Sequence, residues 1–292
     1  MGGNAPPDAV SKELVHALNS KLCAPEGEST AGDWYEDLHH LWASQLSDQE
    51  ESGQPKWYSK ALAYWDNEEN CPPTIDGVLG GFGHVSGVDL VASRQFLSQL
   101  RLQNPQLGSQ KAVECGAGIG RVVKGLLLEH FEHVELVEPS PRLLKAAEAY
   151  VAPFTQRCSF TCMGMQEYSP PERSLDLVWV QWAIGHLTDA DFFSFLRRCE
   201  RALRPGGVVC LKENCSASGH LVDSEDSSIT RTKDYFQRVF ELANMELVLE
   251  MEQEHFPDDL YPVFMFAIRP KAAIESDSRQ EPVEAKEGTT GA

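Results

Sequence analysis

The sequence has no long apolar run, no cysteine framework and few basic residues. No run of eighteen apolar residues occurs, so no membrane-spanning helix is expected. The N-terminus is neither rich in arginine nor followed by an apolar segment, and this pattern predicts neither a transit peptide nor a secretory signal.

The eight cysteines follow no regular spacing and include no C-x-x-C pair. A buried, reduced thiol is expected for those in apolar, strand-like runs, namely Cys115, Cys158, Cys162 and Cys210. We therefore expect a location in the cytoplasm or the nucleus. No metal site is predicted.

Basic residues are scarce: 25 lysines and arginines stand against 44 aspartates and glutamates, a formal net charge of −19 at pH 7. This balance argues against a general nucleic-acid-binding protein, which needs a basic surface to neutralise phosphates. Residues 1–55 alone carry two lysines and ten acidic residues. An acidic domain attracts cationic partners. Solubility alone would also account for this charge.

Composition and pattern divide the chain into three parts. Residues 1–55 form an acidic extension that we predict to be partly helical, with amphipathic helices at Val10–Leu22 and Trp34–Leu46. Residues 56–270 carry the strand and helix patterns of one globular domain. Residues 271–292 are rich in Glu, Ser, Gly and Thr with few large apolar residues, which predicts a disordered tail.

The most informative stretch is V-E-C-G-A-G-I-G-R at residues 113–121. Its three glycines follow a short apolar strand and precede a segment with helical periodicity. Glycines let a ligand approach the backbone without a Cβ in the way, and the next helix offers unpaired N–H groups. A dinucleotide site would have the pattern G-x-G-x-x-G, but Arg121 takes the place of the third glycine.

The spacing E-x-G-x-G-x-G instead resembles motif I of the Rossmann-like S-adenosyl-L-methionine-dependent methyltransferases. In that family a second acidic residue ends the next strand and accepts hydrogen bonds from the ribose hydroxyls. Glu138 fits this role, because it follows an apolar run and lies 24 positions after Glu114. The resemblance implies that S-adenosyl-L-methionine is the cofactor. A structural strand–helix turn without a ligand is the alternative.

Alternating strand and helix patterns predict an α/β fold. We expect a Rossmann-like, doubly wound sheet of seven strands, parallel except for the last strand in the chain, with N-terminal helices and an insertion after strand five. The predicted strands are 112–113, 134–137, 159–163, 175–180, 208–211, 247–251 and 263–268. The predicted helices include 57–65, 88–100, 142–150, 192–203 and 235–243. The insertion contains the acidic stretch His220–Ser228.

Further candidates follow other predicted strands. Ligands in open α/β sheets bind beyond the carboxyl ends of the strands. Met165 and Gln166 follow strand three, where we expect the adenine ring. Trp182 and His186 follow strand four, where the methyl acceptor is expected, although a structural role for His186 is equally consistent. The glycine-rich stretch Pro72–His84 is expected to be a loop that closes over the ligands.

Several stretches together resemble the eukaryotic protein α-N-terminal methyltransferase family. They are Tyr64-Trp65, P-P-T-I-D-G-V-L-G-G-F-G-H, E-C-G-A-G-I-G-R, V-Q-W-A-I-G-H-L-T-D, L-R-P-G-G, L-K-E-N and D-S-E-D-S-S. The resemblance covers about residues 56–270. It implies transfer of methyl groups from S-adenosyl-L-methionine to the free α-amine of proteins that begin X-Pro-Lys or X-Pro-Arg after removal of the initiator Met. We further expect a monomer that binds neither nucleic acid nor membranes.

The resemblance also implies roles for individual residues. The cofactor-binding set is Gly116, Gly118, Arg121, Glu138, Met165 and Gln166, with Trp65 and Gln181 nearby. The set that lines the channel for the peptide N-terminus is Tyr64, Leu79, Gly80, Trp182, Asn214, Asp223, Ser228 and Tyr261. His186 and Asp226 would be the general bases.

The sequence departs from the family pattern at three positions. Glu138 stands where many relatives have Asp. The change keeps a carboxylate that accepts hydrogen bonds from the ribose hydroxyls, but it alters the reach of the side chain. Ser224 interrupts what is a pair of acidic residues elsewhere in the family. This difference concerns the affinity for the Lys or Arg at position three of the substrate. Phe82 takes a place that often carries Tyr.

Three other functions compete with this one. A small-molecule methyltransferase on the same fold would explain motif I and Glu138 but not the glycine-rich loop or the acidic insertion. A lysine side-chain methyltransferase would differ only in the acceptor. A cofactor-binding adaptor without turnover belongs to another class, and the presence of both His186 and Asp226 speaks against it.

Overall fold

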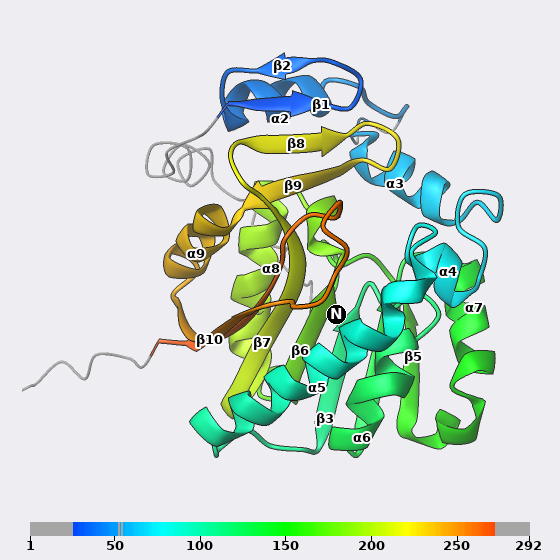
Figure 1. The fold of residues 1–292 in the computed structure, drawn as a ribbon, viewed down its shortest axis with the longest axis vertical. Coiled ribbons are helices and arrows are strands. Elements are labelled where there is room, and N and C mark those ends of the chain that lie inside the picture. Colours follow the sequence, from blue (N-terminus) through cyan, green and yellow to red (C-terminus); the bar gives the residue numbers. More distant parts are fainter. Residues whose placement is uncertain (1–25, 52, 54, 272–292) are drawn as a thin grey trace, which may run out of the picture.

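The computed structural model describes residues 26–51, 53 and 55–271 (Figure 1). The predicted helix Val10–Leu22 and nearly all of the predicted tail lie outside the described residues. Within these ranges, no helix combines the length and apolar character needed to cross a membrane.

The main sheet has the strand order β5-β4-β3-β6-β7-β11-β10 (Figure 1). The bounds are β3 Lys111–Cys115, β4 His133–Glu138, β5 Cys158–Cys162, β6 Leu175–Gln181, β7 Leu203–Ser216, β10 Met245–Glu252 and β11 Val263–Pro270. The pairs from β5 to β7 are parallel, whereas β11 runs antiparallel to both β7 and β10. The predicted seven-stranded α/β fold with a reversed last strand is therefore confirmed.

Helices cover both faces of this sheet and shield its central strand, β6, from solvent. Every residue of β6 is buried, because a parallel strand in the middle of an α/β sheet has no solvent face. Val178 and Val180 belong to one core with α8 Asp189–Ala202 and α9 Lys233–Leu242. Leu177 and Trp179 belong to a second core with α5 Ser86–Gln103 and α7 Pro141–Tyr150. The alternation of side chains along β6 thus separates two apolar layers.

Four further strands extend the sheet past the end of β7 (Figure 1). The predicted acidic insertion is a hairpin of β8 His220–Asp223 and β9 Ser228–Thr232. Strand β9 pairs with the last residues of β7, and β8 pairs in parallel with β1 Gly27–Ser29. Strand β1 in turn pairs with β2 Trp34–Tyr35.

The helix predicted at Trp34–Leu46 is wrong at its start. Residues Trp34–Tyr35 form a strand because they pair with β1, and α2 spans only Leu38–Gln45. Asp37 fixes this boundary, since its side chain accepts a hydrogen bond from the backbone N–H of His40.

The glycine-rich stretch Pro72–His84 is more ordered than the predicted loop. It contains α4 Ile75–Val78 and the 3₁₀ turn η1 Gly83–Val85, which leads straight into α5. A Cβ on Gly77 would lie 2.0 Å from the carbonyl oxygen of Pro72, so only glycine allows this compact packing.

Five short helical elements complete the fold. The predicted helix 57–65 is α3, Trp57–Trp65. The helix after the glycine turn begins as the π-helix η2 Val123–Leu127 and continues as α6 Leu128–His130. The 3₁₀ turn η3 spans Ala152–Arg157. The 3₁₀ turn η4, Ile184–His186, follows β6.

Candidate active site

A pocket of about 280 Å³ lies beyond the carboxyl ends of β3, β4 and β6. All eight residues expected to bind the cofactor line it: Trp65, Gly116, Gly118, Arg121, Glu138, Met165, Gln166 and Gln181. Leu79, Trp182 and His186 also line it. The structure thus brings residues from six separate stretches of the chain to one cavity.

The glycine turn forms the floor of this pocket. Gly116, Gly118 and Gly120 have φ angles of +75°, +52° and +77°, a region that side chains disfavour. A Cβ on Gly116 would lie 2.3 Å from the Cβ of Ala183. The backbone N–H of Gly118 donates to Glu138 Oε2 at 2.8 Å, so the turn and the second acidic residue hold each other in place.

Glu138 is a buried carboxyl that faces the pocket. Its Oε1 accepts a hydrogen bond from the backbone N–H of Ser140 at 2.9 Å. Burial raises the pKa of Glu138 to about 7, although the hydrogen bonds from Ser140 and Gly118 oppose this effect. An ionised carboxylate has about four acceptor sites, and two donors leave capacity for the hydroxyls of a ribose.

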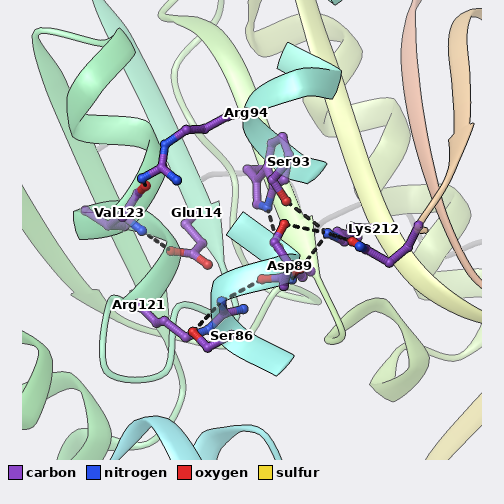
Figure 2. Close-up of polar contacts among 12 residues, drawn as sticks. Ser86, Asp89, Ser93, Arg94, Glu114, Arg121, Val123 and Lys212 are labelled. Atoms are coloured by element: carbon purple, nitrogen blue, oxygen red, sulfur yellow. Dashed lines mark hydrogen bonds and ion pairs between the residues drawn. The ribbon is translucent and has the colours of Figure 1, made fainter. Parts of the chain in front are cut away.

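Behind the pocket lies a buried network of charges, which Figure 2 shows. Arg121 Nη1 is 2.6 Å from Asp89 Oδ2, and Lys212 Nζ is 2.5 Å from Asp89 Oδ1. Lys212 is fully buried and also donates to Ser93 Oγ at 3.0 Å and to Gln253 Oε1 at 2.6 Å. Buried charges persist only when they are paired and hydrogen-bonded in this way.

The network leaves part of Arg121 available to a ligand. Only its Nη1 contacts Asp89 and Ser86, and the guanidinium has further N–H donors at the pocket wall. Such a group suits the carboxylate of a bound amino acid moiety. Together with the acceptor at Glu138 and the open glycine turn, the donor set fits S-adenosylmethionine.

Trp182 marks the side of the pocket where the acceptor is expected. Its φ of +51° is unusual for a residue other than glycine and is held by a hydrogen bond from its N–H to the carbonyl of Lys212 at 3.0 Å. Its ring lies 6.3 Å from that of Phe256, centroid to centroid. Its buried Nε1 has no partner among the residues that the structure describes, which leaves a donor for a ligand carbonyl.

His186 ends the turn η4 and faces the acidic hairpin. Its Nδ1 is 3.1 Å from the carbonyl oxygen of Ser227. A carbonyl only accepts hydrogen bonds, so Nδ1 carries a proton in this contact, and the lone pair of the deprotonated ring then lies on Nε2. The ring packs edge-on against Trp65 with 5.9 Å between centroids, and Trp57 Nε1 donates to the carbonyl of His186 at 2.7 Å.

Asp226 lies in the turn between β8 and β9, outside the pocket lining but next to His186. Burial raises its pKa, while the charge of His186 and a hydrogen bond from Ser228 lower it. Its buried Oδ1 has no hydrogen-bond partner in the described part of the chain. Burial and, after it, the charges of Asp226, Glu225 and Asp223 in the hairpin turn also raise the pKa of Tyr64.

The remaining substrate candidates lie beyond the pocket lining. Asp223 and Ser228 pair with each other where β8 and β9 meet the turn. Gly80 follows α4 with a φ of +58°. Asn214 pairs with Val263 near the end of β7. Tyr261, which is 43% exposed, lies two residues before Val263, the first residue of β11.

Three buried residues that support the site were missed by the sequence reasoning. Burial raises the pKa of Glu213 to about 7, and its Oε1 accepts from the N–H of Asn214. Arg231 is fully buried and pairs with Asp189 at 2.8 Å. Glu213 lies in the stretch L-K-E-N, and Asp189 is the last residue of V-Q-W-A-I-G-H-L-T-D. No pattern in the sequence marked Arg231, the third of these residues.

Comparison with known proteins agrees with this geometry. A family model described as "AdoMet dependent proline di-methyltransferase" matches residues 53–269. The N-terminal Xaa-Pro-Lys N-methyltransferase 1 of Mus musculus is 42% identical over 216 residues, which cover 73% of this chain and 96% of the relative. The alpha N-terminal protein methyltransferase 1 of Arabidopsis thaliana is 37% identical over 251 residues, or 83% and 90% of the two chains.

A solved structure gives the same result. A SAM-dependent methyltransferase from Leishmania major superposes with a TM-score of 0.78 at 36% sequence identity, over 86% of this chain and 98% of the other. The cofactor expected from motif I and the family expected from the combined motifs are both confirmed. This chain therefore belongs to the family of AdoMet-dependent proline di-methyltransferases.

Proposed function

We propose that this protein transfers methyl groups from S-adenosylmethionine to the α-amino group of proteins that begin X-Pro-Lys or X-Pro-Arg once the initiator Met is removed. One observation carries the proposal. His186 and Asp226, two proton acceptors from separate parts of the chain, lie together beside the cofactor pocket. The mouse relative is named for the same kind of substrate.

The reaction requires an unprotonated α-amine. The reference pKa of an α-amino group is about 7.7–8.0, so most of it is protonated at neutral pH and has no lone pair to react. His186 Nε2 and Asp226 Oδ1 are acceptors that take this proton as general bases. Each further methylation of the same nitrogen needs another proton to leave, and a base in the site permits it.

The cofactor supplies an electrophilic methyl group on a sulfonium when it is bound. The chain contributes the binding groups: Glu138 accepts from the ribose hydroxyls, Arg121 pairs with the carboxylate, and the glycine turn lets the ligand approach the backbone. Orientation of the amine toward the methyl then falls to the residues at the acceptor side, because methyl transfer needs mainly in-line positioning.

Charge and hydrogen-bonding groups select the peptide. Asp223, Glu225 and Asp226 form an acidic turn that attracts a free amino terminus and a Lys or Arg at position three. The unpaired Nε1 of Trp182 is available to a carbonyl of the peptide backbone. Ser224 stands in the middle of this turn and weakens its charge relative to the family pattern.

We propose the cytoplasm or the nucleus as the location, and a monomer as the active form. Each cysteine that the structure describes is a free thiol, which suits a reducing compartment. The formal net charge of −19 favours basic protein N-termini over nucleic acid as partners.

Mass spectrometry of three peptides with S-adenosylmethionine tests the function. The peptides begin Ser-Pro-Lys, N-acetyl-Ser-Pro-Lys and Ser-Ala-Lys. We expect methylation of the first alone, because the acetyl group blocks the α-amine and the third lacks proline. Methylation of the acetylated peptide would assign the acceptor to the lysine side chain. No methylation of any peptide would reject the proposal.

A further inference from the structure

We propose that the N-terminal segment, residues 26–46, is a positioning element of the active site that holds the two turns that carry His186 and Asp226. The family match begins only at residue 53, so this segment lies outside it. The inference rests on the proposed function, because it gives the segment a part in that reaction.

The segment first contacts the hairpin that carries Asp226. Strand β1 pairs in parallel with β8 over three residues. Just past β1, the backbone N–H of Thr30 donates to the carbonyl of Val222 at 2.9 Å. The N–H of Ser224, at the start of the hairpin turn, donates to Thr30 Oγ1 at 3.0 Å. These contacts fix the hairpin two residues before Asp226.

Without this segment the hairpin would have a free edge. Strand β9 joins β7 through only two residue pairs, Cys215 with Arg231 and Ser216 with Thr232. Strand β8 pairs with β9 on one side and with β1 on the other. An edge strand attached by so few pairs moves more freely than a strand paired on both sides. Strand β1 therefore restrains the hairpin and its turn.

The segment also reaches the turn that carries His186, through α2. Trp42 Nε1 donates to Asp189 Oδ2 at 2.5 Å. The other oxygen of Asp189 accepts from Arg231, and Arg231 Nη2 donates to the carbonyl of Leu187 at 2.7 Å. This series of hydrogen bonds runs from α2 to the residue that follows His186.

A second route passes through aromatic packing. The rings of Trp42 and Trp57 meet edge to face, with 5.2 Å between centroids. Trp57 Nε1 then donates to the carbonyl of His186 itself. Tyr35 and Leu38 of the segment are buried in the same apolar core as Ile184 and Leu187, which lie close to His186 in the chain. Figure 1 shows β1 alongside β8, with β2 on the far side of β1 and α2 next to these two strands.

Both turns must be held for the two bases to act on one amine. Within residues 26–51, 53 and 55–271, one hydrogen bond joins the two turns directly, the 3.1 Å contact of His186 Nδ1 with the carbonyl of Ser227. A general base must lie within hydrogen-bond reach of its proton, and a small displacement costs much of its effect. The N-terminal segment bonds directly to the hairpin turn and reaches the His186 turn through Asp189 and Trp57, and in this way it keeps the two turns at this distance.

The test uses four single variants of the full chain. Thr30→Val removes the acceptor for Ser224 while keeping the shape, and Thr30→Ser retains the hydroxyl. Trp42→Phe removes the donor to Asp189. Trp34→Phe is the control, because Trp34 lies in the same segment but is 55% exposed. For each variant, kcat and KM are measured for the Ser-Pro-Lys peptide, and the Kd for S-adenosylmethionine is measured by calorimetry.

We expect kcat/KM for the peptide to fall about threefold in Thr30→Val and about tenfold in Trp42→Phe, with most of the loss in kcat, because a displaced base acts less well on an amine that is still bound. Thr30→Ser and Trp34→Phe should behave as the wild type. The Kd for S-adenosylmethionine should not change in any variant. A purely structural loss would lower the number of S-adenosylmethionine sites per chain in the same calorimetry, whereas displaced bases lower kcat with every site still present.

Peptide kinetics in Thr30→Val and Trp42→Phe equal to those of Trp34→Phe would overturn the inference. So would a parallel loss of S-adenosylmethionine affinity. If Trp42→Phe does not fold, the Thr30→Val and Thr30→Ser pair decides. If the wild type methylates no peptide, the proposed function fails on its own, and the NMR signals of the His186 ring replace the kinetics. Identical His186 signals in the wild type and Trp42→Phe would then overturn the positioning role.

Discussion

The two halves of the active site are built in different ways. The cofactor half comes from consecutive strand–helix units, with the glycine turn directly after β3 and Glu138 at the end of β4. The acceptor half is assembled from distant segments, and its supporting hydrogen bonds join residues 129 and 147 positions apart. Local motifs thus determine the first half, whereas long-range contacts determine the second.

The buried charge network lies where the two halves meet. Its members Arg121 and Lys212 belong to different halves, since Arg121 follows the glycine turn and the backbone of Lys212 holds Trp182. Asp89 pairs with both cations and joins them. Separate changes to each half and to the network should therefore give separate effects.

The largest effect is expected from the acceptor half. His186→Ala or Asp226→Asn should lower turnover of the Ser-Pro-Lys peptide by about 10²-fold or more, because each removes a general base. The Kd for S-adenosylmethionine should not change, since the cofactor half is intact. Steady-state kinetics and calorimetry measure the two quantities. Full turnover in both variants would show that neither side chain is a base.

The next effect concerns the network between the halves. Lys212→Met should lower the free energy of unfolding by about 2 kcal/mol, because it leaves Asp89, Ser93 and Gln253 short of a buried donor. Urea unfolding measures this. The matched control is Arg269→Met, which breaks the surface pair with Glu246 and should cost less than about 1 kcal/mol. Equal losses in the free energy of unfolding would mean that the buried network stabilises the fold no more than a surface ion pair does.

A smaller effect is expected from the cofactor half. Glu138→Ala should weaken S-adenosylmethionine binding by about tenfold, because it removes a charged hydrogen-bond acceptor. At saturating cofactor, KM for the peptide should equal that of the wild type. A rise in the peptide KM as large as the loss of cofactor affinity would show that the two halves are not separable.

The smallest predicted effect is a pH dependence of cofactor binding. The pKa of Glu138 is raised to about 7, so this carboxyl is largely protonated at pH 6 and ionised at pH 8. The ionised form is the better acceptor, and S-adenosylmethionine affinity should therefore rise with pH, by about threefold between pH 6.5 and 7.5. Calorimetry at several pH values tests this. The same slope in Glu138→Gln would assign the dependence to another group.

The sequence allowed most of the cofactor half to be predicted, for a physical reason. A glycine turn, its strand and the acidic residue of the next strand lie within one strand–helix–strand unit, so their spacing is set locally. Gly116, Gly118 and Glu138 could be placed from that spacing, and the structure gathers them in one pocket. The parallel sheet then fixes which strand ends face the ligand.

The support of the acceptor half could not be predicted in the same way. Arg231 and Trp42 act through partners far away in the chain, which no local pattern reveals. Residues Trp34 to Leu46 have apolar residues at helical spacing, yet Tyr35 pairs with Gly27 in a strand. Tertiary pairing overrode the helical pattern at that point. Phe256, beside Trp182, lies outside any motif.

The pairing of β1 with β8 has a consequence for synthesis of the chain. Thr30 leaves the ribosome early, but its partner Ser224 follows 194 residues later. Contacts between segments so far apart form late, whereas adjacent strand–helix units can associate as they emerge. A nascent chain that has passed β7 can already form the cofactor pocket while the hairpin is still unmade. The protein therefore gains its cofactor site before it gains the capacity to act on a substrate, and the segment 26–46, synthesised long before the hairpin, completes the last step.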